Sequence, residues 1–341
     1  MGQNQIKVGM VTRRAYITHM GSYLPNRILT NADLEKIVDT SDEWIVSRTG
    51  MRERRIAHEG EFTSDMGYQA AKKCLENAQI DPNEVDLIIV ATITPDYLFP
   101  STACMIQELL GASRAAAFDI QAACSGFLYA LGTAKSFIES GIYNKILVIG
   151  SEKLSSIVDY EDRSTCVLFG DGAAACLVQE GGSGLRIDAF ELGADGHQNH
   201  LLILPGGGCR KPTSLETLKN RDHFLKMDGR GIFKHAVRRM EQSMVETIEK
   251  ANLTCEEIDW LVPHQANIRI IDSLTKRCGI DDSKVIKTVE KYGNTSASSI
   301  GIGLDEMIEK NLIKEGDNLL LLAFGAGLTW GSMVLKMVGA K

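Results

Sequence analysis

Four short stretches of this sequence contain residue types that could carry out nucleophilic chemistry. Cys124 lies in "FDIQAACSGFLYALGTAKSFIESG", where an apolar stretch gives way to a helical pattern. His264 lies in "VPHQANIRII" and Asn294 in "YGNTSASSIGIGL". The fourth stretch, "FGAG" at 324–327, offers backbone N–H groups that can form an anion-binding nest. Together these stretches supply a thiol, an imidazole, a carboxamide and donors for a negatively charged oxygen.

Each residue also has a purely structural interpretation. A thiol at a helix N-terminus feels the partial positive charge of unpaired N–H groups, which favours the nucleophilic thiolate. Gly126, just after Cys124, would let a ligand approach the backbone. Alternatively, Cys124 is a buried structural thiol, His264 a hydrogen-bonded loop residue and Asn294 a helix cap or turn residue. Only the combination of the four stretches favours a catalytic site.

The elements that would position these residues alternate between strands and helices along the chain. Continuous apolar runs predict buried strands at 85–92, 115–120, 145–151, 258–264 and 317–325. Apolar residues at helical spacing predict helices at 64–78, after Cys124 and around 232–248. The pattern is typical of an α/β protein. Two of the four stretches follow buried strands and the others lie in glycine-rich turns, so all four could meet at one end of a sheet.

An internal similarity indicates a duplicated unit. "FGDGAAACLVQE" (169–180) resembles "FGAGLTWGSMVLKM" (324–337), and each closes a run of similar element order. We therefore expect an N-terminal extension at 1–14, a first half at 15–182 with the cysteine, and a second half at 183–341 with the histidine and asparagine. Residues 193–228 form a long, irregular excursion, which we interpret as a lid over a binding site.

The composition restricts the class of protein. The chain has 341 residues, 44% hydrophobic and 24% charged, as in soluble globular proteins, and its net charge of −7 argues against nucleic-acid or membrane-surface binding. The eight cysteines contain no C-x-x-C and fit no zinc or disulfide framework. We expect reduced thiols in a cytoplasmic protein. Neither a signal peptide nor a membrane-spanning stretch is evident.

These motifs, taken together, resemble the β-ketoacyl-[acyl-carrier-protein] synthase III family from about residue 14 onward. The resemblance also includes "GSYLP", "TSDEWIVSRTGMRER", "FPSTACMIQ" and "DRSTCVLFGDGAA". It implies the thiolase fold, in which two duplicated α/β halves stack as a five-layer αβαβα arrangement. It further implies an acyltransferase that initiates type II fatty-acid synthesis. Such an enzyme condenses a short acyl-CoA with malonyl-[acyl-carrier protein] through an acyl-cysteine, releases CO2, works as a homodimer and needs no metal or redox cofactor.

The resemblance also implies a role for individual residues. The catalytic triad would be Cys124, His264 and Asn294, and the backbone N–H groups of Cys124 and Ala326 would form the oxyanion hole. The family's positions for coenzyme A correspond here to Thr40, Trp44, Arg163, Gly229 and Asn267, with Trp44 and Arg163 sandwiching the adenine. Phe99 matches a residue that closes the acyl pocket of the partner subunit.

An acidic carrier protein would need a local basic patch on this acidic chain. Arg269 and Lys276 lie seven residues apart on one predicted helix, with Arg277 adjacent, and Lys234 and Arg238 lie four apart on another. We interpret these five residues as the docking patch. Solvated helix faces are the alternative interpretation.

The sequence departs from the family at two points, and three other classes of protein are alternative interpretations. Ala326 occupies a position where the family usually has glycine, and the loop at 205–222 is longer than usual. A Cys-His-Asn protease fits poorly, because its asparagine would lie nearer the cysteine. A thiolase-fold acyltransferase of secondary metabolism would have the same triad, and a non-catalytic acyl-CoA-binding relative would lack part of it. The preferred starter acyl group is not evident from the sequence.

Overall fold

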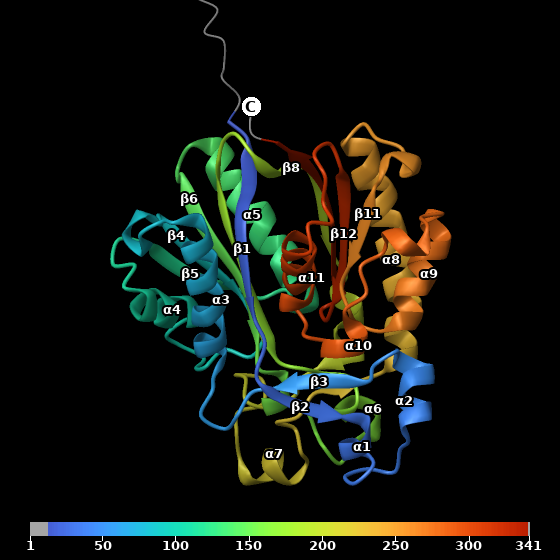
Figure 1. The fold of residues 1–341 in the computed structure, drawn as a ribbon. Coiled ribbons are helices and arrows are strands. Elements are labelled where there is room, and N and C mark those ends of the chain that lie inside the picture. The colour runs from blue at the N-terminus through green and yellow to red at the C-terminus, as the bar shows by residue number, and fades with distance from the viewer. Residues whose placement is uncertain (1–12, 340–341) are drawn as a thin grey trace, which may run out of the picture.

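The computed structural model describes residues 13–339 (Figure 1). The proposed extension at 1–14 therefore lies, apart from its last two residues, outside the described residues. The strands are β1 (Ala15–Tyr23), β2 (Arg27–Thr30), β3 (Glu53–Ile56), β4 (Leu87–Ala91), β5 (Ala116–Ile120), β6 (Lys145–Glu152), β7 (Gly172–Glu180), β8 (Gly184–Ala194), β9 (Leu202–Ile203), β10 (Lys226–Met227), β11 (Trp260–Pro263), β12 (Asn318–Gly325) and β13 (Thr329–Val338).

The α-helices vary from single turns to the 22 residues of α8. They are α1 (Asn31–Leu34), α2 (Asp42–Thr49), α3 (Thr63–Ala78), α4 (Thr102–Leu110), α5 (Gly126–Ser140), α6 (Arg163–Cys166), α7 (Leu215–Lys219), α8 (Gly229–Lys250), α9 (Ile268–Cys278), α10 (Val289–Tyr292) and α11 (Ser298–Glu309). Short 3₁₀ turns lie between them, including η2 (Ala123–Ser125) and η4 (Gly196–Leu201). All five predicted strands and the predicted helices are present, which confirms the α/β assignment.

The main sheet consists of two groups of strands joined by a short seam. The strand order is β11-β12-β13-β8-β1-β7-β6-β4-β5. The seam between β8 and β1 contains only two residue pairs, Tyr16 with Arg186 and Ile17 with Leu185. In the first group β5, β4 and β6 are parallel and β7 and β1 antiparallel to their neighbours. In the second, β11 and β12 are parallel, followed by antiparallel β13 and β8.

The element order of the first group recurs in the second. The order β1-α3-β4-α4-β5-α5-β6-β7 corresponds to β8-α8-β11-α9-α11-β12-β13. The position of β5 is marked in the second group by an isolated parallel bridge between Leu261 and Val285. This recurrence supports the idea of a duplicated unit. The exact boundary between the halves at 182/183 stays a prediction.

Helices and sheets form five layers (Figure 1). Helices α3 and α4 cover the outer face of the first group of strands, and α8 and α9 cover the outer face of the second. Helices α5 and α11 lie between the groups and contact strands of both. The apolar core is divided accordingly into a middle cluster and two outer clusters. The predicted αβαβα thiolase fold is confirmed.

Small residues allow the central helices to lie close to the strands. A Cβ on Gly126 at the start of α5 would come within 3.0 Å of the Ala91 Cβ at the end of β4. On α11, a Cβ on Gly301 would come within 2.6 Å of the Ala174 Cβ. Because these positions cannot hold a larger side chain without movement, the start of α5 is fixed against the end of β4.

The excursion at 193–228 is more ordered than its sequence predicts. It contains η4, α7 and a small sheet formed by β9 and β10. It is attached to the body by the Leu225 N–H, which donates to the Ile157 carbonyl at 2.9 Å, and by an ion pair between Arg221 and Asp159 at 2.5 Å. The segment thus contains only short elements between turns and bends, and its role as a lid stays a prediction.

Candidate active site

Cys124 lies in a tight turn where β5 leads into α5. The turn is η2, and α5 begins two residues after the cysteine. Ala123 has φ +46°, a left-handed conformation that costs energy for a residue with a side chain. The end of β12 presses on this turn, since a Cβ on Gly325 would lie 2.7 Å from the Cys124 nitrogen. The glycine therefore permits the close approach that fixes the position of the thiol.

His264 follows β11 and is buried with a fixed ring orientation. Its backbone N–H donates to the Leu322 carbonyl at 2.7 Å, and its Nδ1 lies 2.7 Å from the Ser299 hydroxyl on α11. Burial lowers the pKa of His264 to about 3, so the imidazole is neutral. The Ser299 oxygen also accepts from the Gln265 N–H at 3.4 Å, and the Ser299 hydroxyl can at the same time donate its proton to Nδ1. The Nε2–H of His264 is then the donor that remains for the cavity.

Asn294 is held in the loop between α10 and α11. Its N–H donates to the Leu168 carbonyl at 2.8 Å, and its carbonyl accepts from the Gly170 N–H at 3.0 Å. Its side-chain Oδ1 accepts from the Ser296 N–H at 2.9 Å. This bond fixes the amide orientation and directs Nδ2, the donor end, elsewhere.

The three proposed triad residues line one cavity. This larger cavity has an empty volume of about 790 Å³, and Gly229, Met227, Ile232, Phe233, Met240, Ala266, Asn267, Ile270, Gly325 and Ala326 are among its other lining residues. A smaller cavity of about 440 Å³ begins at the opposite side of Cys124 and is almost entirely apolar, with Ile93, Leu154, Ile157, Leu204 and Leu225 among its lining residues. Cys124, Phe169, Leu202 and Ala326 border both. The sulfur thus lies at the junction of two cavities.

The electrostatic environment of Cys124 differs from the sequence-based expectation. We expected the helix N-terminus to favour the thiolate, but burial raises the pKa of the Cys124 thiol to about 12. The nearby Glu152 carboxylate raises it further, and a hydrogen bond with the Ser296 side chain opposes the increase. In the resting site the sulfur is therefore protonated, and a reaction would need a group that accepts its proton.

Ala326 is compatible with the loop it occupies. The left-handed φ of this loop, +133°, falls on Gly327 and not on Ala326. The concern that an alanine would distort the loop is thereby removed, because its backbone N–H needs no conformation reserved for glycine. Ala326 borders both cavities beside Cys124, as an oxyanion donor would.

The residues proposed to bind coenzyme A divide into two groups. Gly229 and Asn267 line the larger cavity at the starts of α8 and α9. Trp44 and Arg163 lie outside it and stack directly, with the guanidinium 4.9 Å from the ring centroid. An adenine between them would require Arg163 to swing away. The Thr40 hydroxyl is buried without a hydrogen-bond partner, which makes it a free donor for a ligand.

Phe99 does not contribute to either cavity of its own chain. Its exposed fraction is 86%, and the adjacent Leu98 and Tyr97 are 83% and 60% exposed. Three neighbouring apolar side chains in water are costly to leave uncovered. Their exposure supports the proposal that a second subunit covers them.

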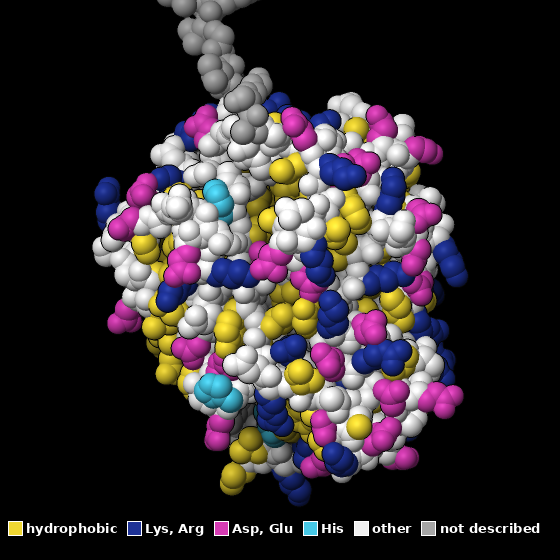
Figure 2. Space-filling model, in the orientation of Figure 1, with side chains coloured by type: hydrophobic (Ala, Val, Ile, Leu, Met, Phe, Trp, Pro, Cys, Tyr) yellow, Lys and Arg dark blue, Asp and Glu magenta, His cyan; other side chains and the backbone are white. Residues whose placement is uncertain are grey.

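The proposed docking patch has one member, Arg269, beside a residue that lines the larger cavity. All five basic residues are exposed, and the two helices that carry them, α8 and α9, pack together. Arg269 lies over Phe233, which lines the cavity, at 5.7 Å from the ring centroid. Arg277 is engaged in an ion pair with Glu241. Figure 2 shows that basic side chains alternate with acidic ones on the visible face, so any basic docking region is local.

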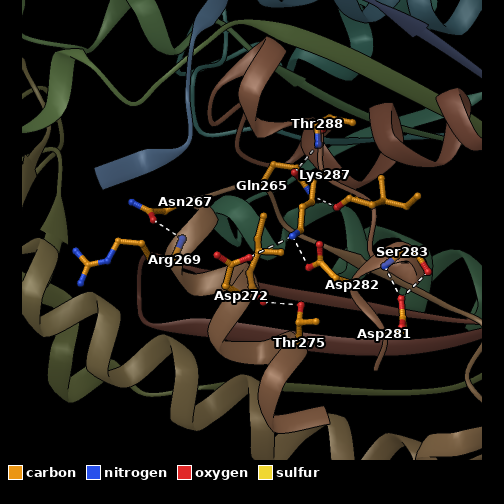
Figure 3. A network of polar contacts seen from close by, with 12 residues as sticks. Gln265, Asn267, Arg269, Asp272, Thr275, Asp281, Asp282, Ser283, Lys287 and Thr288 are labelled. Carbon is orange, nitrogen blue, oxygen red and sulfur yellow. Dashed lines mark hydrogen bonds and ion pairs between the residues drawn. The ribbon is translucent and has the colours of Figure 1, made fainter. Parts of the chain in front are cut away.

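Sequence reasoning missed the residues that support the triad. Gln265, next to His264, accepts from the Thr288 and Val289 N–H groups at 2.8 and 3.0 Å and donates to the carbonyls of Pro263 and Ile286 (Figure 3). It thereby connects the loop after β11 to the segment that leads to Asn294. Gln265 directly follows His264 in the sequence, but nothing there indicates that it is buried.

An outer shell of polar contacts holds the start of α9 in place (Figure 3). The Asn267 side chain caps the helix by accepting from the Arg269 N–H at 2.8 Å. Lys287 connects α9 to the following turn through Asp272 at 3.2 Å and Asp282 at 2.5 Å. Across the part of the chain described here, we find no group of three or more His, Cys, Asp or Glu side chains arranged to hold a metal, and no helix that could cross a membrane.

A cysteine in a strained turn at a helix N-terminus, faced by a neutral histidine and an asparagine amide in a five-layer fold, defines a thiolase-fold condensing enzyme. Comparison with known proteins narrows the class. A family model of 3-oxoacyl-[acyl-carrier-protein] synthase III matches residues 118–196, and a model of its C-terminal part matches residues 248–337. This chain belongs to the β-ketoacyl-[acyl-carrier-protein] synthase III family.

Individual relatives cover nearly the whole chain. The β-ketoacyl-[acyl-carrier-protein] synthase III of Chlamydia pneumoniae is 56% identical over 327 residues, which are 96% of this chain and 98% of that protein. The crystal structure of the Aquifex aeolicus enzyme is 50% identical, with a TM-score of 0.88 over 94% of this chain and 99% of that one. The priming β-ketosynthase of the R1128 polyketide pathway is 34% identical, with a TM-score of 0.88 over 97% and 98%.

Proposed function

We propose that this chain catalyses the first condensation of fatty-acid synthesis, between a short acyl-CoA and malonyl-[acyl-carrier protein]. One observation carries the proposal: Cys124 lies at the junction of two cavities, and His264 and Asn294 line the larger one. A thioester delivered through the larger cavity would place its carbonyl carbon at the sulfur and its acyl chain in the smaller apolar cavity. The first half-reaction then transfers the acyl group to Cys124 and releases coenzyme A.

The second half-reaction would use the two neutral donors. When malonyl-carrier protein replaces coenzyme A, loss of CO2 leaves negative charge on the thioester oxygen. The Nε2–H of His264 and the Nδ2–H of Asn294 can both donate to that oxygen. A neutral imidazole suits this role because it stabilises the enolate without protonating its carbon. The carbanion attacks the acyl-cysteine and forms the β-ketoacyl product.

Substrate binding follows from the lining of the larger cavity. Its apolar side chains, Met227, Ile232 and Phe233 among them, would hold the pantetheine arm shared by coenzyme A and the carrier protein. Thr40, Trp44, Arg163, Gly229 and Asn267 would hold the rest of coenzyme A, and the basic residues of α8 and α9 would hold the carrier protein. Phe99 would cover the smaller cavity of a second subunit in a homodimer. These assignments, and a cytoplasmic location, stay predictions.

Two assays test the proposal in order. Incubation with radiolabelled acetyl-CoA should label Cys124 covalently, and malonyl-carrier protein should then convert the label to a β-ketoacyl-carrier protein. Transfer of the label to a different acceptor would instead favour an acyltransferase of secondary metabolism, and no label at all would refute both. Loading rates across acyl-CoAs of increasing length would identify the starter unit, since each buried methylene is worth about 0.8 kcal/mol.

A further inference from the structure

A fully buried carboxylate lies behind the nucleophile, and the scheme above gives it no role. Glu152 ends β6 and has an exposed fraction of 0%. Its Oε1 accepts from the Ser296 hydroxyl at 3.0 Å. Ser296 and Cys124 both border the smaller cavity, and the Ser296 side chain lowers the pKa of the Cys124 thiol. Ser296 therefore connects the cavity that the cysteine borders to a buried acid.

The hydrogen bonds around Glu152 all point toward it. Its Oε2 accepts from the Thr92 hydroxyl at 3.1 Å, the Thr94 hydroxyl at 2.7 Å and the Ile93 N–H at 3.1 Å. The two threonine oxygens themselves accept from backbone N–H groups of Thr94 and Lys153. Each hydroxyl proton is thereby directed to Glu152, so the arrangement holds an ionised carboxylate. Burial nevertheless raises the pKa of Glu152 to about 7, which makes the carboxylate a ready proton acceptor.

The direction in which the Ser296 hydroxyl donates its proton determines the direction in which a proton could move between the thiol and Glu152. Because the Ser296 hydroxyl donates to Glu152, its oxygen can accept a proton when the Cys124 thiol reacts. Ser296 has φ +50°, a left-handed conformation that is unfavourable for serine and that this site maintains. His264, the other ionisable group beside the sulfur, is a poor acceptor, since burial lowers its pKa to about 3.

The other charged groups around Glu152 are engaged elsewhere. Lys153 directly follows the end of β6, and its Nζ donates to the carbonyls of His58, Glu59 and Glu61. Asp171, at the start of β7 beside it, accepts from Ser155 and from the Ala57 N–H. Neither forms a described contact with the carboxylate, so the thiol is the group through which Glu152 can change charge.

We propose that Ser296 and Glu152 form a proton relay that activates Cys124. As the sulfur attacks the thioester carbonyl, the thiol proton passes to the Ser296 oxygen and the Ser296 proton passes to Glu152. Coenzyme A leaves as a thiolate and takes a proton from solvent. When the carbanion later displaces Cys124 as a thiolate, the proton returns from Glu152 by the same route. One proton is thus moved out and back in each cycle, and the site never holds a thiolate and a carboxylate together.

In the proposed relay Ser296 takes the proton from the sulfur, whereas Glu152 acts through Ser296. The relay deepens the proposed function, but alkylation of Cys124 by iodoacetamide tests it without any thioester. In the wild type, the internal transfer predicts an alkylation rate that rises to a plateau above about pH 7, the pKa of Glu152. In Glu152→Gln and Ser296→Ala, the plateau should vanish and the rate should keep rising with pH toward the pKa of an isolated buried thiol.

Whether Glu152→Gln slows, speeds up or does not change alkylation distinguishes the relay from two other roles for Glu152. If Glu152 acts only as a nearby negative charge, Glu152→Gln would lower the thiol pKa and speed up alkylation. If the residue is only structural, the profile would keep its shape. Asp171→Asn is the matched control, because it removes another fully buried, hydrogen-bonded carboxylate that is not connected to the sulfur. Faster or unchanged alkylation in Glu152→Gln, or in Ser296→Ala should the first variant not fold, overturns the relay.

The same variants link the relay to turnover. Acyl transfer from acetyl-CoA should slow by roughly 10²-fold in Glu152→Gln and Ser296→Ala, and the double variant should be no slower than either. Additive losses would contradict a single relay. A wild type that shows the alkylation plateau but accepts no acyl group would refute the proposed function and leave the relay intact.

Discussion

The two halves of this molecule share one element order but hold opposite kinds of ionisable group at the site. In the first half, the end of β5 and the end of β6 hold Cys124 and Glu152, both with raised pKa values. In the second half, the end of β11 holds His264, whose pKa is lowered to about 3. Burial causes all three shifts, and it suppresses the charged form of each group.

This difference indicates a division of labour. The first half holds the two ionisable groups that would exchange a proton through Ser296, and the second holds the neutral donors His264 and Asn294. A duplicated framework would thus place the ends of the proton transfer in one half and the donors for the enolate in the other. The predictions below test whether the two sides are separable.

Removal of the nucleophile should affect both half-reactions. Cys124→Ala eliminates the only group proposed to hold the acyl chain, so we expect acyl-enzyme formation and condensation each to fall by roughly 10⁴-fold or more. Mass spectrometry of the intact protein after incubation with acetyl-CoA measures the first, and product formation the second. Cys176→Ala, at a buried thiol far along β7, should still acquire the label. Acylation of the Cys124→Ala protein would show that a group other than Cys124 accepts the acyl chain, and would contradict the proposed division between the halves.

Removal of the donors should affect one half-reaction only. His264→Ala and Asn294→Ala should lower condensation by roughly 10²- to 10³-fold, the usual loss for an oxyanion donor. Acyl transfer from acetyl-CoA should stay within about tenfold of the wild type, because Cys124 and Glu152 lie in the first half and both variants retain Ser296. Single-turnover labelling and steady-state condensation measure the two rates separately. Equal losses in both rates would show that the halves act as one unit.

The contact between the halves can be disturbed at one glycine. In Gly325→Ala the new Cβ would meet the Cys124 nitrogen at 2.7 Å and the Ala123 Cβ at 3.1 Å. The turn must shift, and a displacement near 1 Å can cost about 10²-fold, so we expect a loss of this order in acyl transfer. Gly208→Ala, whose Cβ would meet nothing within 4 Å, is the control. A normal acylation rate in Gly325→Ala would mean that β12 does not position the thiol.

Carrier-protein docking should belong to the second half alone. Arg269→Glu reverses a charge beside Phe233, which lines the larger cavity, so we expect the KM for malonyl-carrier protein to rise by roughly tenfold, while the KM for acetyl-CoA stays unchanged. Arg277→Glu is the comparison, because Arg277 is already paired with Glu241 and should matter less. A similar rise in both KM values would place Arg269 in the coenzyme A site instead.

The sequence revealed the groups proposed to react but not the groups that support them. Continuous apolar runs identified β5 and β11, which precede Cys124 and His264, and glycine-rich turns drew attention to Asn294 and to the end of β12. Glu152 was hidden within the strand run "KILVIGSEKL", where only the fold shows that its carboxylate turns toward Thr92, Thr94 and Ser296. Ser299 and Gln265 were missed for the same reason, since their partners are brought together by tertiary packing.

The prediction that Cys124 is a thiolate was wrong for a different physical reason. A helix N-terminus stabilises a thiolate by a modest amount when the sulfur is exposed, whereas full burial acts on the same group more strongly and with opposite sign. Burial of a side chain depends on every layer around it, and no local motif contains that information. The helix-terminal position was predicted correctly, but its electrostatic consequence was not.

The smallest expected effect, on stability, has opposite signs in the two halves. The pKa of His264 is about 3 in the folded protein and ordinarily 6.5, so between these values only the unfolded chain binds the proton, and the free energy of unfolding falls as pH is lowered. The pKa of Glu152 is about 7 against an ordinary 4.5, so the folded chain binds the proton first and stability falls as pH rises. Compared with the wild type, His264→Gln should therefore lose less stability between about pH 6.5 and 4.5, and Glu152→Gln should lose more, each by roughly 2 kcal/mol.

Urea unfolding at both pH values measures these differences, with His200→Gln, at an exposed histidine, as the control. Shifts of the same sign would contradict the contrast between the halves. They would mean that His264 and Glu152 titrate as one coupled pair. The protonation of the imidazole would then depend on the protonation of the carboxylate. Opposite shifts that add in the double variant would show that each half sets the protonation state of its own group.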